Sequence, residues 1–515
     1  MSVSLEEVIR PFGVTQRILS FPSESLEVSY NEVARRACSG ARRLIAAGVR
    51  PGEPVAISLG NDLMSVTAAL SVWYAGCTLV SVPPMPRHAQ PDHLGGVAQA
   101  MAAMGCDVYI TNGPVPVPLQ SLRHIPIGLV TSPEGGKADA DPAQAIAPIA
   151  LVQFTSGSVG SAKGVAISGD KLAGHVLAIG EHVGADSETD RCFSWLPLYH
   201  DMGFVAKFLA SFASRLDTFI VPPAEFAASP RRWFTGIART GATMTGGPDF
   251  AYRLAAGARY LEDLDLSKVR VCTSGAERVQ WTSLTALHRA LEPFGMRWEA
   301  FTPCYGMAEG VVAATMSPVG RGPVLGPGGH VSTGVPIRGV RIAAADGSEP
   351  APMRLGGSWL FEGYCTATGF EPTAGDWFDT GDAGFTHDGE LYVLGRMAEV
   401  INFAGRNVFA EDVESVALRV ESASVQGVAA FRTTSDHNRF SIVIELNHLE
   451  RPDATQIGHR IRDAVLKSLG VRISPVVLTK QGTIPRTTSG KAQRARCRIA
   501  YEAGDCDQRI LAVVD

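Results

Sequence analysis

The first 150 residues alternate between short apolar runs and longer segments with helical spacing of apolar positions. Apolar runs at residues 54–59, 78–82 and 108–111 are typical of buried strands, and residues 30–47 and 63–74 have the spacing of helices. Strands that alternate with helices indicate a parallel sheet that is covered by helices on both faces. We therefore expect an α/β fold for this part of the chain.

The same alternation continues to about residue 305. Apolar runs at 149–154 and 165–167 flank a loop rich in glycine and serine, which predicts strand, loop, strand. Ligands lie at the carboxyl ends of strands in open α/β sheets, so we expect a binding site where the strands end in small, polar or acidic residues. The pattern predicts strands at 192–197, 218–221, 269–273 and 298–303, helices at 170–183, 203–214 and 230–240, and a tight turn at 246–250.

The pattern changes after residue 320. Residues 331–395 lose the helical rhythm and predict an antiparallel subdomain, with strands at 340–344, 357–361 and 390–394. After Arg396 the pattern becomes mixed α+β. A helix is expected to begin near residue 411, because acidic side chains in the next few positions suit the positive end of a helix dipole. A strand at 441–446 and a helix at 454–469 follow.

Composition and charge exclude several classes of protein. At 515 residues the chain is long enough for about three domain-sized units. The formal net charge of −5 gives no reason to expect nucleic acid or an anionic membrane as a partner. Nine scattered cysteines without a C-x-x-C pair argue against a disulfide framework or a zinc site, and fit a reducing cytoplasm.

One uncharged run, residues 63–86, is long enough to be mistaken for a membrane span. Gly76, Pro83 and Pro84 interrupt it, so a buried helix followed by a buried strand explains the run better. The acidic N-terminal sequence also lacks the basic and then apolar pattern of a signal peptide. We expect a cytoplasmic protein without a transmembrane segment.

The loop between the apolar runs at 149–154 and 165–167 has the composition of an anion-binding loop. Free backbone N–H groups and hydroxyls suit an anion, small residues let the backbone approach it closely, and Lys163 adds a mobile positive charge. The loop is not a Walker A motif, because Ala162 precedes Lys163 and Gly164 follows it. A solvated hairpin loop is the alternative interpretation. The small and polar residues of the loop are Thr155, Ser156, Gly157, Ser158 and Gly160.

Five motifs occur in one order along the chain. They are the loop at 154–164, the YGMAE at 305–309, the TGD at 380–382, the GR at 395–396 and the SGK at 489–491. Together they resemble the acyl-adenylate-forming, or AMP-binding, enzyme superfamily, over about residues 30–500. That superfamily includes acyl-CoA synthetases, fatty acyl-AMP ligases and the adenylation domains of peptide synthetases.

A sixth stretch refines this resemblance. The LPLYHDMG at residues 196–203, together with the YGMAE, is most similar to the fatty acyl-AMP ligase branch. The fold that the resemblance implies is a large N-terminal domain, residues 1–396, made of two α/β subdomains and a small β-subdomain. A small, mobile α+β domain, residues 397–515, would follow it as a lid.

The resemblance implies a nucleotide site built from widely separated residues. The glycine-rich loop and Lys163 would hold the β- and γ-phosphates of ATP. Glu309 would bind Mg²⁺, a hard cation that prefers carboxylate oxygens together with phosphates. Lys491 would reach the α-phosphate and the substrate carboxylate. The residues implied around the adenine and the ribose are Gly275, Ala276, Glu277, Cys304, Tyr305, Gly306, Met307, Ala308, Asp382 and Arg396.

Each of the main residues also has a plainer interpretation. Glu309 could be a surface carboxylate, and Tyr305 could be a core tyrosine. Asp382 has the lone pairs to accept hydrogen bonds from both ribose hydroxyls, but it could also simply cap its own turn. Arg396 could form a surface ion pair, and Lys491 could be a solvated lysine in a flexible loop. The presence of all five motifs in one chain favours the nucleotide site.

The acyl pocket is expected beside the nucleotide site. By resemblance, His200 lies at its mouth, as a candidate catalytic residue together with Lys163, Glu309 and Lys491. A metal site at His200 and Asp201 is disfavoured, because adjacent residues point in different directions and no third ligand lies nearby in sequence. The pocket looks apolar, which favours a fatty, aryl or terpenoid-like acid over an amino acid, with Asp249 as the main reservation. The expected lining is Gly247, Pro248, Phe250 and Tyr252.

Two positions depart from the family pattern. Val159 stands in the phosphate loop where threonine is usual, so one hydroxyl is lost although backbone amides remain. Ala398 stands at the proposed hinge where a charged residue is usual. A change of backbone angles at a hinge does not require a charge. Gly405, just past that hinge, is expected to line the tunnel for the thiol after the small domain rotates.

The function implied is ATP-dependent activation of a carboxylic acid, followed by acyl transfer to a thiol. The thiol belongs either to CoA or to the phosphopantetheine of an acyl or peptidyl carrier protein. Strict acyl-AMP ligases carry an extra segment between the YGMAE and the next Gly-x-Pro; here Glu309 and Gly334 are only 25 residues apart, which favours CoA. ATP, Mg²⁺ and CoA are the expected cofactors. A homodimer is compatible with such a chain. The alternative of another class is a non-catalytic binding protein that keeps this fold.

Overall fold

The structure is a computed structural model, and most of the chain is described in it. The described residues are 3–10, 17–82, 91–111, 113–132, 145–154, 162–260, 264–403, 406–420, 424–433, 439–447, 451–487 and 490–515. The loop residues Thr155, Ser156, Gly157, Ser158, Val159 and Gly160 lie outside these ranges, and so does Gly405. Their predicted roles therefore stay predictions.

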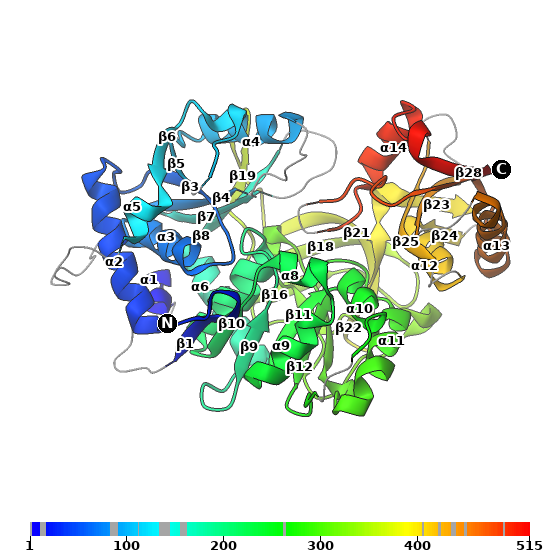
Figure 1. Cartoon of the computed structure of the whole chain (residues 1–515), viewed down its shortest axis with the longest axis horizontal. Helices are drawn as coiled ribbons and strands as arrows, with labels where there is room; N and C mark the ends of the chain where they lie inside the picture. Colours follow the sequence, from blue (N-terminus) through cyan, green and yellow to red (C-terminus); the bar gives the residue numbers. More distant parts are fainter. Residues whose placement is uncertain are drawn as a thin grey trace.

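The N-terminal elements build an eight-stranded sheet with helices on both faces (Figure 1). Strands β7, β4, β3, β5 and β6 are parallel, as the alternating pattern predicts, and β8, β19 and β20 extend the sheet antiparallel. In spatial order the strands are β20 (Gly369–Pro372), β19 (Gly363–Thr366), β8 (Gly164–Ser168), β7 (Ile149–Phe154), β4 (Thr78–Val82), β3 (Pro54–Ser58), β5 (Val108–Thr111) and β6 (Arg123–Pro126).

Helices cover this sheet because successive strand residues face opposite sides. Val55 and Ile57 pack in the core that contains α2 (Tyr30–Ala46) and α3 (Leu63–Tyr74), whereas Ala56 packs in the core of α4 (Pro91–Ala103). The uncharged run is thus a buried helix and a buried strand, as expected. Within the described residues, no helix is long and apolar enough to cross a membrane. The short helices α1 (Leu5–Ile9) and α5 (Ile127–Thr131) complete this half.

A second, nine-stranded sheet follows along the chain. Strands β13, β12, β11, β9, β10 and β1 are parallel, so their carboxyl ends meet at one edge. In spatial order the strands are β15 (Val335–Pro336), β14 (Thr315–Met316), β13 (Phe301–Tyr305), β12 (Val271–Gly275), β11 (Met244–Pro248), β9 (Arg191–Ser194), β10 (Asp217–Ile220), β1 (Ile18–Phe21) and β2 (Leu26–Ser29).

The two faces of this sheet carry different helices. One face packs against α9 (Arg232–Thr240), α10 (Asp249–Ala256) and α11 (Trp281–Leu291) in one continuous core. The other carries α6 (Gly169–His182), the π-helix η3 (Met202–Leu209) and α7 (Ala210–Ala213). The short helix α8 (Pro223–Ala228) precedes α9.

Two smaller regions complete the molecule. A mostly antiparallel sheet contains β16 (Val340–Ala343), β18 (Ala351–Gly357), β21 (Trp377–His387), β17 (Ala345–Asp346) and β22 (Glu390–Arg396). The C-terminal elements have their own sheets and core and gather at one end of the molecule in Figure 1. They are β23 (Val400–Phe403), β24 (Arg406–Phe409), α12 (Ala410–Val420), β25 (Val425–Phe431), β26 (Phe440–Leu446), α13 (Arg451–Leu469), β27 (Ile473–Lys480), α14 (Arg494–Glu502) and β28 (Ile510–Val514).

Two predicted elements are wrong, and a third is a helix of a different type at its start. Residues 357–361 are not a strand: β18 ends at Gly357, and Trp359 turns back to donate from its Nε1 to the carbonyl of Arg338, at 2.6 Å. Residues 246–248 belong to strand β11 rather than to a tight turn. The helix predicted at 203–214 begins as the π-helix η3, and π-helical turns occur frequently at functional sites.

Candidate functional site

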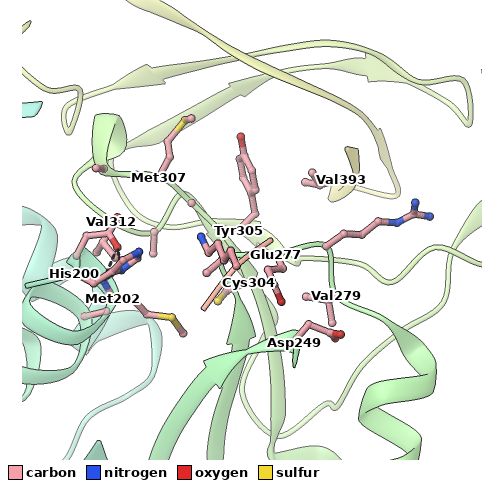
Figure 2. Close-up of a pocket in the computed structure, with 18 of the residues that line it drawn as sticks. His200, Met202, Asp249, Glu277, Val279, Cys304, Tyr305, Met307, Val312 and Val393 are labelled. Carbon is pink, nitrogen blue, oxygen red and sulfur yellow. Dashed lines mark hydrogen bonds and ion pairs between the residues drawn. The ribbon is translucent and has the colours of Figure 1, made fainter. Parts of the chain in front are cut away.

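The carboxyl ends of β12 and β13 meet β21, β22 and the C-terminal loop around one cavity of about 990 Å³. Figure 2 shows several of its lining side chains, among them Tyr305, Glu277 and His200. Residues from both the large and the small predicted domain line it. The sequence-predicted residues that do so are Lys163, His200, Phe250, Ala276, Glu277, Cys304, Tyr305, Gly306, Met307, Ala308, Glu309, Asp382, Arg396 and Lys491.

A tyrosine, an aspartate and an arginine form the centre of the site. Tyr305 ends β13 and donates from its hydroxyl to Asp382 Oδ2 at 2.6 Å. Asp382 on β21 lies opposite Arg396 on β22 in the strand register, and Arg396 Nε is 3.0 Å from Asp382 Oδ1. Burial raises the pKa of Asp382 above its ordinary value, although Arg396 and the tyrosine hydroxyl favour the charged form. The carboxylate is thus held in one orientation at the cavity wall.

Gly275 and Ala276 form a tight corner at the end of β12. A side chain at Gly275 would place its Cβ 2.6 Å from Cys304 Sγ, so only glycine fits between β12 and β13 here. Gly275 therefore supports the wall of the cavity from behind. Ala276 has φ of +64°, a left-handed conformation that an alanine adopts only at a cost. This strained corner turns the backbone toward the cavity in front of Tyr305.

Glu309 lies one turn beyond β13 and is held by the other large sheet. Tyr364 on β19 donates its hydroxyl to Glu309 Oε1 at 2.8 Å, and Lys163 Nζ lies 4.8 Å from the centroid of the Tyr364 ring. Burial raises the pKa of Glu309. One tyrosine therefore positions both the predicted metal ligand and the predicted phosphate-binding lysine, and no sequence motif marks Tyr364 for this role.

The donor set of this corner fits a hard divalent cation only if phosphates supply the other ligands. No group of three or more His, Cys, Asp or Glu side chains that could hold a metal is found within the described ranges. A single carboxylate can serve Mg²⁺, because that ion keeps waters and phosphate oxygens among its ligands.

Lys491 reaches the cavity from the C-terminal loop. Its positive charge lies close enough to Asp201 and Asp382 to favour the charged form of both carboxyl groups, although burial still keeps the pKa of Asp382 raised. The loop itself approaches the large domain closely: a Cβ on Gly490 would lie 2.9 Å from the Phe250 ring. The structure therefore brings Lys491 into the same cavity as Tyr305, Asp382 and Glu309.

His200 and Asp201 form a pair rather than pointing apart. His200 Nδ1 lies 2.5 Å from Asp201 Oδ1, which also accepts the Met202 backbone N–H at 2.6 Å. Burial would raise the pKa of Asp201, but His200 and then Lys491 hold that pKa below its usual value. The sequence-based expectation that these neighbours diverge is wrong, and the pair begins the π-helix η3.

The predicted acyl-pocket residues need a correction. Of the four, only Phe250 lines the cavity. The Cβ direction of Gly247 faces Trp233 at 3.1 Å and Trp195 at 3.2 Å, in the core behind the sheet. Tyr252 is fully buried in that core and donates its hydroxyl to the carbonyl of Cys272 at 3.0 Å, and Pro248 does not line the cavity either.

The cavity instead extends between helices and the nine-stranded sheet, and we name this part the helix–sheet branch. Its floor is the sheet face that carries α6, η3 and α7, because alternate strand residues such as Met244 point to this face. A one-residue difference in strand parity moves a side chain to the other face, which is why Gly247 was misplaced. The branch is lined by Ile179, Gly180, Val183, Cys192, Met202, Ala206, Lys207, Ala210, Ser211, Ser214, Leu216, Met244, Val271, Thr273, Cys304 and Met316.

Asp249 borders the cavity, but its carboxylate serves the fold. Oδ1 accepts the Gln280 backbone N–H at 2.8 Å and Oδ2 accepts the Ser283 hydroxyl at 2.7 Å, at the start of α11. Burial raises the pKa of Asp249 to about 7. Both oxygens are therefore engaged at a helix N-terminus, which removes the main reason to expect an amino-acid substrate.

The raised pKa makes the effect of Asp249→Asn on stability depend on pH. Folded wild type binds a proton here that the unfolded chain releases near pH 4, so this group's contribution to stability falls as the pH rises from about 4 to 7. We expect the free energy of unfolding of the variant, taken relative to that of wild type, to be about 1–4 kcal/mol higher at pH 8 than at pH 5. Urea unfolding at both pH values measures this, with exposed Asp505→Asn as control; a gain independent of pH would contradict it.

Comparisons with known proteins show the family of this chain. A model of the AMP-binding enzyme family matches residues 12–370. Putative ligase Rv1013 of Mycobacterium tuberculosis is 31% identical over 94% of this chain and 96% of its own length. The medium-chain-fatty-acid–[acyl-carrier-protein] ligase JamA of Moorena producens is 30% identical over 70% of this chain and 69% of its own.

A solved structure shares the whole architecture. It comes from a study of fatty acyl-adenylate ligases from E. coli and L. pneumophila, has 25% identity and a TM-score of 0.85, and 98% of each chain is covered. The match confirms the expected arrangement of a large α/β N-terminal part and a small C-terminal part.

Proposed function

The chain belongs to the AMP-binding enzyme family, and from this premise we propose how its cavity activates an acid. The enzyme is an acid–thiol ligase that forms an acyl adenylate. The observation that carries the residue assignment is the convergence of Tyr305, Asp382, Arg396, Glu309 and Lys491 on one cavity, although they come from four separate segments of the chain.

The nucleotide is proposed to lie against Tyr305. The tyrosine ring would face the adenine from one side, and the corner formed by Gly275, Ala276 and Glu277 would face it from the other. Asp382, with Arg396 beside it, would accept the ribose hydroxyls, because a carboxylate has lone pairs for two donors. The backbone from Cys304 to Ala308 would run along the purine.

The reacting centre is proposed between two lysines. An oxygen of the substrate carboxylate forms a bond to the α-phosphorus of ATP while the bond from that phosphorus to the bridging oxygen breaks, and pyrophosphate leaves. Lys491 would hold the attacking carboxylate and the α-phosphate oxygens, and Lys163 with residues 155–160 would hold the departing phosphates. Mg²⁺ on Glu309 would neutralise phosphate charge. Positioning and charge stabilisation account for catalysis of this kind.

ATP–pyrophosphate exchange with a panel of carboxylic acids tests the proposal. We expect exchange that depends on the acid, on ATP and on Mg²⁺. The absence of exchange with every fatty, aryl and oxygenated acid tried would favour the non-catalytic alternative.

Glu309→Gln is expected to lower the exchange rate by roughly 10²-fold at fixed Mg²⁺, because it removes one charged ligand while keeping the shape of the side chain. The rate should recover in part at higher Mg²⁺ concentration, which the exchange assay follows directly. Exposed Glu299→Gln is the matched control. An unchanged Mg²⁺ dependence would remove Glu309 from the metal site.

CoA is the acceptor that we propose first. Gly334 follows Glu309 by only 25 positions, and the chain between them contains only β14, the short 3-10 helix η7 (Pro327–Gly329) and irregular loops. A carrier-protein phosphopantetheine is the second candidate, supported by the similarity to JamA, a ligase that joins a medium-chain fatty acid to an acyl-carrier protein. Acyl adenylate supplied with either CoA or a holo carrier protein discriminates the two by the thioester that forms.

A further inference from the structure

Lys207 is a buried cation in the helix–sheet branch. It stands on the π-helix η3, only 7% exposed, and lines the branch together with mostly apolar side chains. Its Nζ donates to the Thr245 carbonyl at 3.0 Å and to the Thr273 hydroxyl at 2.8 Å. The ammonium is therefore held against the floor of the branch, at the sheet.

Both acceptors are neutral. No carboxylate lies within 4.0 Å of Lys207 Nζ among the side chains that the structure describes, and an ammonium has a third N–H to donate. A buried charge without a counter-charge costs several kcal/mol, so such groups are normally paired. Lys207 lacks that partner within the described protein.

The neighbouring backbone leaves room for this ammonium. A Cβ on Gly246 would lie 2.9 Å from Lys207 Nζ, so any larger residue on this part of β11 would compete with the charged group for space. The sulfur of Cys304, the residue before Tyr305, also lines the branch near this charge. The ammonium thus lies on the nucleotide side of the branch.

The far end of the branch is different. There Val183 and Leu216 pack with Met244 and Val271, the residues that begin strands β11 and β12. Lys207 instead contacts Thr245 and Thr273, further along the same strands toward their carboxyl ends and the adenylate side. An acyl chain that enters from the adenylate side would therefore pass the ammonium before it reaches the end.

We propose that the acid activated here carries an oxygen acceptor along its acyl chain, with a second carboxylate as the best partner, and that Lys207 binds this oxygen. A carboxylate would supply the missing counter-charge, and a ketone or hydroxyl would accept the same N–H more weakly. The inference rests on the proposed function, because it names the class of acid that the adenylating site receives.

The competing explanation is purely structural, with Lys207 only tying η3 to strands β11 and β12. The two explanations differ in substrate ranking. If Lys207 is only structural, its replacement should change stability and lower the rates for all acids together. If it contacts the acyl chain, its replacement should change the ratio of the rates for oxygenated and methyl-terminated acids.

The experiment measures kcat/KM for pyrophosphate exchange with three acid series of matched chain length: α,ω-dicarboxylic, ω-hydroxy or keto, and methyl-terminated. We expect wild type to prefer the best dicarboxylic acid over its methyl-terminated equivalent by about 10- to 100-fold. Lys207→Met should abolish or reverse this preference. Lys207→Gln, which keeps a donor, should keep part of the preference for the hydroxy or keto acid.

Exposed Lys268→Met is the matched control and should keep the wild-type ranking. Equal ranking in wild type and Lys207→Met overturns the proposal, and so does a wild type that prefers methyl-terminated acids throughout. If no acid supports exchange, the proposed function itself fails. Thermal stabilisation of wild type by dicarboxylic acids without ATP, lost in Lys207→Met, then still supports the contact, and its absence overturns it.

Discussion

Lys491→Ala is expected to slow acyl-adenylate formation by roughly 10²- to 10³-fold, the scale for losing one preorganised charge-stabilising group. Lys491 lies near Asp201 and Asp382 in the cavity, where it would bring a positive charge to the proposed α-phosphate position. Transfer from acyl adenylate supplied directly should be nearly normal. Each half-reaction is measured separately, by pyrophosphate release and by thioester formation.

Gly405→Leu is the complementary variant, because Gly405 is predicted to line the thiol tunnel after the small domain rotates. A side chain there should obstruct the thiol arm while adenylation continues. Exposed Lys480→Ala on β27 is the control for a charge lost from the same domain. Equal impairment of both half-reactions by both variants would contradict a two-pose mechanism for this protein.

The contacts between the large and small parts fit the first of these two poses. Arg278 pairs with Asp412 at 2.5 Å, and Ser415 donates to the side chain of Gln280 at 3.0 Å. Together with the approach of Gly490 to Phe250, these contacts hold the C-terminal loop over the nucleotide cavity. Rotation of the small domain would have to break each of them.

The residues proposed to bind the nucleotide could be singled out in the sequence because their chemistry is concentrated in short motifs. Tyr305 and Arg396 end strands, Glu309 follows one, and Asp382 lies within β21; the motif order alone predicted that they converge. The side chains that hold them could not be found in this way. Tyr364 reaches Glu309 only because β19 pairs with β8 across a long stretch of sequence.

The acyl half was predicted less well, for two physical reasons. A strand such as β11 alternates its faces, so Gly246 faces Lys207 in the branch while Gly247, the residue that was predicted to line the pocket, faces the core behind the sheet. The second reason is that one sequence feature was not used in the prediction. Lys207 is the only charged residue in the apolar segment 203–214. A charge in a buried helix needs a reason, and a ligand is one such reason.

The C-terminal region depends on a network that the sequence did not reveal. Arg494 donates to Glu399 at 2.5 Å, to Glu411 at 2.7 Å and through two nitrogens to both oxygens of Glu414, each at 2.7 Å. Glu399 directly follows Ala398 at the proposed hinge. One guanidinium therefore joins the hinge, α12 and α14, and it partly neutralises three carboxylates.

Arg494→Met is expected to destabilise this region by about 3–5 kcal/mol at pH 8, because it leaves three mostly buried carboxylates without a positive partner. Burial already raises the pKa of Glu399 and Glu411 even with Arg494 present. Without the arginine both pKa values rise further, so the folded variant takes up protons that the unfolded chain has released. The destabilisation should therefore shrink as the pH falls from 8 to 5.

Urea unfolding at pH 5 and pH 8, with hydrogen exchange of α12 and β25 as the local measurement, tests this expectation. Exposed Arg419→Met at the end of α12 is the matched control, and its small effect should not depend on pH. Adding Glu399→Gln and Glu411→Gln to Arg494→Met should recover much of the lost stability at pH 8, since it removes the charges that the arginine balanced. A loss of equal size at both pH values would mean that Arg494 stabilises the region by packing rather than by its charge.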